Sequence, residues 1–387
     1  MMKKKLLVLT SLFASTAMLG ACGNLGKATS GGGASQAVTS KKKGYQTTGQ
    51  TDTDYYQGII KDGRYLTNKA RGVGVYQNSD NMLNLKSFEA GLTNLSKEQF
   101  PTKSYVFREG QILSKDTVEN WLDRKTKDNP DGLNPEDNGK KEADKRNPIY
   151  VQQIEEQDYM QEKDGKLSLA GVTIGIGMNQ KAVSYTHLRA QTYTTDISTE
   201  KMKEEGQKAA ATILARLRQK SEIGNDTPIL ICMFKQAPND SLVGGSFYAY
   251  ALSKNGTSIS SWTDTDIKSV VLPATDSSSV PNENDATSFS AFMNKTQSFF
   301  PNLAGVTAQA QYKGKELQGM HVNITTQFYS MTEITSFTQF VSQMARTYLP
   351  SGVPVDITIK GSDGTVQAFL SRDSGQNSYY THVFNSY

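Results

Sequence analysis

Residues 169–178 read LAGVTIGIGM. This stretch decides the fold because the order of predicted elements around it occurs a second time later in the chain. Its β-branched and apolar residues predict a buried strand. Downstream, 199–220 has the spacing of an amphipathic helix, and the apolar runs 229–234 and 245–252 predict two more strands. The last of these strands ends at the turn signal Asn255-Gly256. The order is therefore strand, helix, strand, strand.

A second block of the chain follows the same order. Residues 317–324, LQGMHVNI, match the first strand, and 332–349 match the helix. Two strands then follow at 353–359 and 364–371, and the second ends at Ser374-Gly375. An internal repeat of this kind takes precedence over any local motif in assigning the fold.

The correspondence continues upstream of each block. Short helices are predicted at 116–122 and 288–293, and each leads through Pro and Gly into an extended run, at 149–154 and 306–312. The sequence helix, strand, strand, helix, strand, strand thus occurs twice. Helices alternating with strands joined by tight turns favour an α+β architecture over a parallel Rossmann sheet.

We therefore expect two related α+β domains in tandem, with residues 114–256 and 287–375 superposing as two copies of one unit. The domain boundaries that follow are a signal peptide at 1–21, a flexible tether at 22–56, a first domain with an N-terminal extension at 57–271, a linker rich in Ser, Asn and Pro at 272–285, and a second domain at 286–387. Within the tether, Gly23 to Thr53 holds too few large apolar residues to offset the entropy of ordering.

The N-terminus has the features of a bacterial lipoprotein signal. Three lysines precede the apolar run Leu6–Met18, which is followed by a lipobox, the short motif that directs cleavage and lipidation. At ~1.5 Å rise per residue, the apolar run is roughly 20 Å long as a helix, short of a ~30 Å hydrocarbon core. The lipobox residues are Leu19, Gly20, Ala21 and Cys22.

Cleavage is expected between Ala21 and Cys22, which leaves the Cys22 thiol as the lipidation site. Two or more acyl chains suffice for stable anchoring, whereas one chain is marginal. The expected partner is thus the membrane, through the lipid anchor, and the expected location is the outer face of the cell membrane of a Gram-positive bacterium.

Composition limits the remaining functions. Removal of three signal lysines from the 42 basic residues leaves 39 against 38 acidic residues, so a basic surface for nucleic acid is not expected. Beside Cys22, only Cys232 remains, which excludes an intramolecular disulfide. Cys232 lies in the apolar run TPILICMF, 227–234, where a free cysteine behaves as a small buried hydrophobe.

Three short motifs follow the lipobox and the tether along the chain. They are NPDGLNP at 129–135, FKQAP at 234–238 and GGSF at 244–247. With the paired repeat, they resemble the CamS family of Gram-positive lipoproteins over nearly the whole chain. The resemblance implies that the signal peptide is the precursor of a short peptide sex pheromone for plasmid conjugation. By position, the pheromone segment would be residues 15–21.

Catalytic and metal-binding motifs are not evident. None of His187, His321 and His382 has a partner at metal-ligand spacing, and residues 128–144 lack the ligand spacing of an EF-hand. The segment 182–190, which contains His187, fits neither the repeat nor the family pattern. Gly175-Ile176-Gly177 lacks the third glycine of a dinucleotide motif and predicts a close backbone approach. We predict no metal, no cofactor and no catalytic residue.

Two functional classes remain open for the mature chain. The favoured one is a non-catalytic module that binds a peptide, protein or cell-wall partner. The alternative is a cell-wall-directed hydrolase that uses a carboxylate pair, because paired acids leave no local sequence signature. Two facing carboxylates in a cleft would favour the hydrolase, whereas a shallow groove lined by tyrosines would favour binding.

Overall fold

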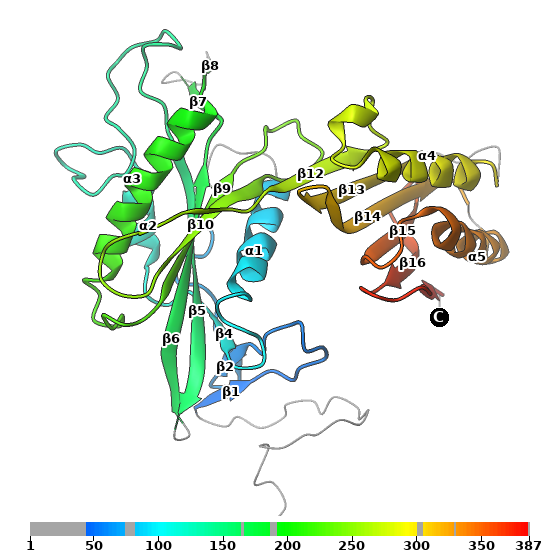
Figure 1. Cartoon of the computed structure of the whole chain (residues 1–387), viewed down its shortest axis with the longest axis horizontal. Coiled ribbons are helices and arrows are strands. Elements are labelled where there is room, and N and C mark those ends of the chain that lie inside the picture. The colour runs from blue at the N-terminus through cyan, green and yellow to red at the C-terminus, as the bar shows by residue number, and fades with distance from the viewer. Residues whose placement is uncertain are drawn as a thin grey trace, which may run out of the picture. The chain divides into compact units, whose positions relative to one another are not determined.

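The computed structural model describes residues 44–73, 82–163, 166–185, 192–299, 305–328 and 330–385. The predicted signal peptide, the lipobox, the pheromone segment 15–21 and Cys22 lie outside these residues, as does His187. The described chain is of the α+β class, with two six-stranded sheets that account for two sheet-rich halves (Figure 1). Smaller sheets are formed by β1 (Tyr45–Thr47), β2 (Ile59–Lys61) and β3 (Arg64–Tyr65), and by β7 (Lys181–Tyr185) and β8 (Thr192–Asp196).

The first sheet has the strand order β11-β10-β9-β6-β5-β4. Its central pair, β6 and β9, is parallel, because helix α3 crosses over between these strands, and every other pair is antiparallel. The strands and helices of this half are α1 (Met82–Ser96), β4 (Val106–Glu109), α2 (Lys115–Leu122), β5 (Val151–Lys163), β6 (Lys166–Met178), α3 (Thr199–Leu217), β9 (Ile229–Lys235), β10 (Ser246–Ser253) and β11 (Thr263–Asp264).

The second sheet has the order β12-β13-β14-β15-β16-β17. Here β14 and β15 are the parallel pair, joined by the crossover helix α5, and the other pairs are antiparallel. The elements are β12 (Ile267–Leu272), η2 (Ser277–Ser279), α4 (Glu283–Gln297), β13 (Gly305–Lys313), β14 (Glu316–Thr326), α5 (Met331–Tyr348), β15 (Val355–Gly361), β16 (Val366–Arg372) and β17 (Tyr380–Val383).

The predicted repeat is present, and its strand order is the same in both sheets. Strands β5, β6, β9 and β10 correspond to β13, β14, β15 and β16, with the same parallel centre. The repeat also extends further than the sequence indicated. In each copy one further strand precedes the first helix, β4 in the first copy and β12 in the second. Another follows the last expected strand, β11 in the first copy and β17 in the second. These added strands occupy the same edges of the two sheets.

Side-chain caps explain where the helices begin. Ser198 accepts a hydrogen bond from the backbone N–H of Lys201 at the start of α3, and Ser114 does the same for Thr117 in α2. In α5, Ser330 and Glu333 form a reciprocal capping box. Both crossover helices therefore start close to the positions expected from the sequence.

Several element boundaries differ from the sequence-based expectation. The run expected at 149–154 is a thirteen-residue strand, β5, because backbone pairing with β6 continues through polar residues. Strand β12 pairs with β13 although the expected first domain reached residue 271, and the expected linker 272–285 contains η2 and the start of α4. Strand β1 lies inside the expected tether 22–56, where its pairing with β2 involves backbone groups and no large apolar core.

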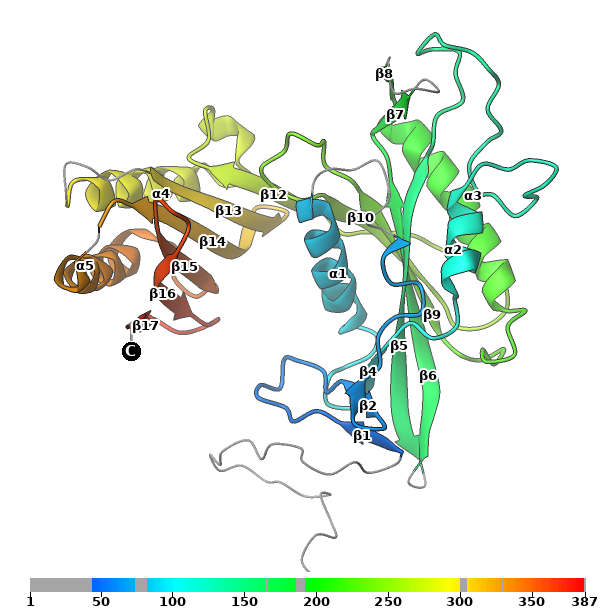
Figure 2. The same cartoon turned by 180° about the vertical axis from the view of Figure 1, so that it is seen from behind.

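Hydrophobic cores lie on both faces of the first sheet. Helices α2 and α3 cover one face, and α1 covers the other, as Figures 1 and 2 show from opposite sides. The α1 face is built around Phe88, Leu92, Phe100 and Tyr159, all buried. Cys232 belongs to this core in β9, which confirms its expected burial, and burial raises the pKa of its thiol.

Candidate functional site

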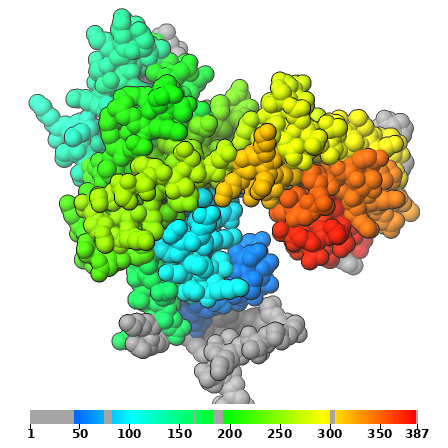
Figure 3. Space-filling model, viewed as in Figure 1, coloured from blue at the N-terminus to red at the C-terminus, as the bar shows by residue number. Residues whose placement is uncertain are grey.

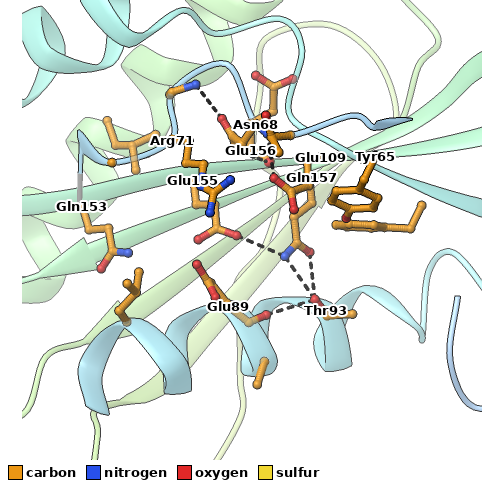
Figure 4. A pocket seen from close by; sticks show the side chains of 17 residues that line it. Tyr65, Asn68, Arg71, Glu89, Thr93, Glu109, Gln153, Glu155, Glu156 and Gln157 are labelled. Carbon is orange, nitrogen blue, oxygen red and sulfur yellow. Dashed lines mark hydrogen bonds between the residues drawn. The ribbon is translucent and has the colours of Figure 1, made fainter. Parts of the chain in front are cut away.

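A pocket of about 760 Å³ lies between α1, strand β5 and the segment Tyr65–Gly72 (Figure 4). This volume falls within the ~300–1,000 Å³ range typical of small-ligand sites. In the space-filling view, α1 (cyan) forms part of the molecular surface next to the blue N-terminal strands (Figure 3). The lining residues are Tyr65, Thr67, Asn68, Ala70, Arg71, Gly72, Leu85, Glu89, Ala90, Thr93, Phe107, Glu109, Gln153, Ile154, Glu155, Glu156 and Gln157.

Glycines in β6 position the helix that forms one wall. A Cβ built on Gly175 would lie 2.6 Å from Phe88 of α1, and one on Gly171 would lie 2.2 Å from Phe100. Neither ring could pack there against a larger residue. The predicted close approach at Gly175 is therefore confirmed. It allows α1 to pack closely on the sheet, with its Glu89 and Thr93 side chains directed towards β5.

The floor of the pocket consists of alternate residues of β5. Because side chains alternate across a strand, Gln153, Glu155 and Gln157 share one face of β5, and this face is directed towards α1. The Gln157 amide donates to Thr93 Oγ1 at 3.1 Å and to Glu155 Oε1 at 3.2 Å, and it thereby links helix and strand. Tyr159 Oη in turn donates to Gln157 Oε1 at 2.9 Å.

Carboxyl groups dominate the charge of the pocket. Burial raises the pKa of Glu155 to about 8, and the negative charge of Glu89 acts in the same direction. Partial desolvation and the charge of Glu109 raise the pKa of Glu89, which Arg71 lowers. Figure 4 shows Glu89 on α1 and Glu155 on β5 directed towards one another. Near neutral pH, Glu155 therefore holds a proton for much of the time.

The neighbouring carboxyls Glu156 and Asp158 hold the pocket's back wall together. Glu156 accepts backbone hydrogen bonds from Gln111, Ile112 and Leu113 at 2.6–2.9 Å. Asp158 accepts two hydrogen bonds from Arg108, at 2.9 and 2.7 Å. Burial and the charge of Asp158 raise the pKa of Glu156, against the effect of its backbone donors. All these partners are internal, so Glu156 and Asp158 serve to fix the strand and the following loop.

The remaining polar groups separate into those that are satisfied and those that are not. Glu109 accepts from the backbone N–H of Asn68 at 2.6 Å, which fixes the segment 65–72 against β4. Gln153 is only 6% exposed, and Figure 4 draws no hydrogen bond between its carboxamide and the other lining residues. No group of three or more His, Cys, Asp or Glu side chains with metal-binding geometry occurs among the described residues.

The sequence reasoning did not identify this pocket. Its lining comes from four stretches, 65–72, 85–93, 107–109 and 153–157, and none contains a recognised motif. Residues 152–158 read QQIEEQD, so no alternation of polar and apolar residues marked 153, 155 and 157 as one face. The groove lined by tyrosines that would have favoured binding is not what the pocket shows, since Tyr65 is its one tyrosine. His321, on β14, and His382, on β17, lie in the second sheet and are not among the lining residues.

Comparison with known proteins matches residues 65–378 to a family described as CamS sex pheromone cAM373 precursor. The chain belongs to the CamS family. The match includes all the pocket-lining residues as well as both sheets, and it confirms the resemblance drawn from the sequence motifs. A family of sex pheromone precursors suggests a protein of the cell surface or exterior.

Two solved structures extend this finding. A sex pheromone precursor from Lactobacillus salivarius is 64% identical, with a TM-score of 0.86, over 89% of this chain and 100% of the other. The C-terminal domain of the sex pheromone staph-cAM373 precursor from Staphylococcus aureus is 28% identical, with a TM-score of 0.68, over 80% of this chain and 99% of the other. Neither is described as an enzyme. No curated protein matched the chain.

The helices were also compared with the requirements of a membrane span. Among the described residues, no helix combines sufficient length with sufficient hydropathy to cross a bilayer. Cys22 lies outside the described residues, so a lipid anchor there stays a prediction from the sequence.

Proposed function

We propose that this CamS-family chain is a lipid-anchored surface lipoprotein whose mature part is a non-catalytic binding module and whose signal peptide is the source of a conjugation pheromone. The lipobox at 19–22 supports the anchor, and the family supports the pheromone, because its members are described as pheromone precursors. The proposed partners are the membrane, through the anchor, and a peptide or cell-wall ligand in the pocket.

The observation that carries the binding role is a polar side chain at the floor of the pocket. Gln153 is 6% exposed and lines a space large enough for a small ligand, and Figure 4 draws no hydrogen bond between its carboxamide and the other lining residues. Its amide donors and its acceptor are therefore available to a ligand that enters the pocket.

Membrane fractionation of a Cys22→Ala variant tests the anchor. Without the thiol, lipidation is blocked, so the variant is expected to accumulate as unprocessed precursor or to appear in the soluble fraction. The wild-type chain and a Ser30→Ala variant, which keeps the lipobox, serve as controls. Normal cleavage and unchanged membrane retention of Cys22→Ala would contradict the anchor.

Thermal unfolding tests the binding role directly. A ligand at about 100 times its dissociation constant adds about 2.7 kcal/mol of stability, which raises the melting temperature by several degrees. We expect such a rise with short peptides or cell-wall fragments, and its loss in Gln153→Ala. A rise that persists in Gln153→Ala would place binding elsewhere, and the absence of any rise across the panel would contradict a binding role for the pocket.

One observation favours the alternative of a cell-wall hydrolase. Glu155 keeps its proton near neutral pH, as a general acid must, and Glu89 lies opposite on α1. The test is release of reducing sugar from purified cell walls by the wild-type chain and by Glu155→Gln. Release that depends on Glu155 would establish the hydrolase and overturn the non-catalytic proposal.

A further inference from the structure

Within the pocket, the polar groups and the charges point to the same kind of ligand. Gln153 lies at the floor with 6% exposure, and Figure 4 draws no hydrogen bond between its carboxamide and the other lining residues. Its neighbour two residues along the strand is Glu155, and both face α1. The carboxamide oxygen can accept a hydrogen bond from a ligand in the pocket.

The balance of charges around this floor is negative. Glu89 on α1, Glu109 on β4 and Glu155 on β5 face the cavity, while Arg71 is the basic residue of its lining. With Glu156, four carboxyl groups line the cavity against one guanidinium, and this disfavours an anionic ligand. Among the described residues, these acids do not form a group of three or more that could hold a metal ion.

Resting on the proposed binding role, we propose that the pocket binds a protonated primary amine, held by the Glu155 carboxylate and the Gln153 carboxamide oxygen. An ammonium group brings three donors and no acceptor, which suits a floor that offers oxygen acceptors. The volume of about 760 Å³ leaves room for the group that carries the amine, such as an alkyl chain or a short peptide.

Binding of the ammonium group should displace a proton. In the empty pocket Glu155 is protonated up to a pH near 8, and a bound cation favours its ionised form. Glu89, Glu109, Glu156, Tyr65 and Arg71 are the other titratable groups that face the cavity, and Arg71 stays charged throughout. The amine itself has a pKa of about 10, so it remains protonated while Glu155 titrates.

Calorimetry of the full-length chain in neutral detergent, with cadaverine as the probe, tests the proposal. Affinity should rise by about fivefold or more from pH 6 to pH 8, and titration in two buffers of different ionisation enthalpy should show proton release on binding. A tripeptide with a central lysine is titrated in parallel. Tighter binding of the tripeptide would indicate that the amine belongs to a peptide, and tighter binding of cadaverine would indicate a free diamine.

Matched probes and variants make the result decisive. The neutral 1,5-pentanediol should bind at least about tenfold more weakly than cadaverine, and Glu155→Gln should weaken cadaverine by about tenfold and abolish proton release. Glu316→Gln, an exposed residue of β14, is the control for loss of a carboxylate outside the pocket. Proton release by the wild-type chain requires no variant, so a folding defect in Glu155→Gln cannot obscure the result.

Two outcomes would overturn the inference. Equal binding of the diol and the diamine would show a neutral ligand site, which leaves the binding role intact and removes the amine. Absence of binding by cadaverine and by the lysine tripeptide at pH 8 would also overturn it. The binding role itself fails only if no compound stabilises the chain through Gln153, which the thermal unfolding panel measures separately.

Discussion

At the residue scale, Glu155 couples the pocket to pH. Its pKa lies at about 8 in the folded chain, above the ordinary value of 4.5, because burial disfavours the charge. The folded state therefore binds more protons than the unfolded state between these two values. The stability that this proton contributes is complete below pH 4.5 and is lost as pH rises through 8.

A Glu155→Gln variant is therefore expected to gain stability relative to the wild type as pH rises. Glutamine carries no charge, so it avoids the cost of burying a carboxylate at pH 9, whereas at pH 5 the two chains differ little. The measurement is the melting temperature at both pH values, where each kcal/mol shifts it by about 1–2 °C in a chain of this size. A difference that stays constant from pH 5 to pH 9, or that matches Glu316→Gln, would contradict the assignment.

The proposed pheromone segment yields a second prediction at this scale. A peptide as small as residues 15–21 has few groups with which to gain affinity, so its apolar area should limit its potency. Ser15 and Thr16 reduce that area. We expect a synthetic peptide with Thr16→Ile to induce plasmid transfer at a lower concentration than the natural segment. Equal or lower potency of the isoleucine peptide in a conjugation assay would contradict the burial argument.

At the element scale, the close packing of α1 on β6 depends on glycine at Gly175 of the strand. A Cβ at Gly175 would lie 2.6 Å from a buried Phe88 ring, and neither the strand nor the core residue can move freely. Gly175→Ala is expected to cost about 1–3 kcal/mol of unfolding free energy, as overpacking of a core does. Urea unfolding measures this cost. Gly49→Ala, where a Cβ meets nothing within 4 Å, is the control and should be near neutral; an equally small loss at Gly175 would show that α1 is loosely packed.

The same scale shows which elements a sequence can reveal. Strand β9 and residues 171–178 of β6 form mainly apolar, buried runs, and helix α3 has a cap and amphipathic spacing, so their patterns predict them. Strands β4 and β11 are short, lie at a sheet edge and are held by backbone pairing with a neighbour distant in sequence. No local pattern encodes that pairing, and for this reason the two outer strands of each repeat were not predicted.

The candidate site was beyond prediction for a related reason. Glu89, Glu109 and Glu155 are separated by 20 or more residues and come together only when α1 and β4 pack beside β5. The raised pKa of Glu155 arises from burial and from Glu89, and neither cause can be read from its sequence neighbours. By contrast, the burial of Cys232 followed from an uninterrupted apolar run around it.

At the scale of the whole molecule, the repeat defines where the second half begins. Leu272, at the end of β12, is fully buried in the core with α4 and α5, and the strand pairs with β13 over six residues. We expect a fragment of residues 266–387 to unfold cooperatively in urea. A fragment of residues 286–387, which lacks β12, should be less stable by at least about 2–5 kcal/mol, the cost typical of losing one buried leucine. Equal stability of the two fragments would show that β12 does not stabilise the second half.

The helix α1 precedes the first copy of the repeat and has no counterpart before the second among the described residues. The pocket therefore belongs to an addition to one copy, while the duplicated framework is shared by both. Such an arrangement separates what selection must conserve from what it can change. Replacement of residues 65–93 would alter one wall of the pocket, whereas β5, which carries Gln153 and Glu155, is constrained by both the sheet and the site.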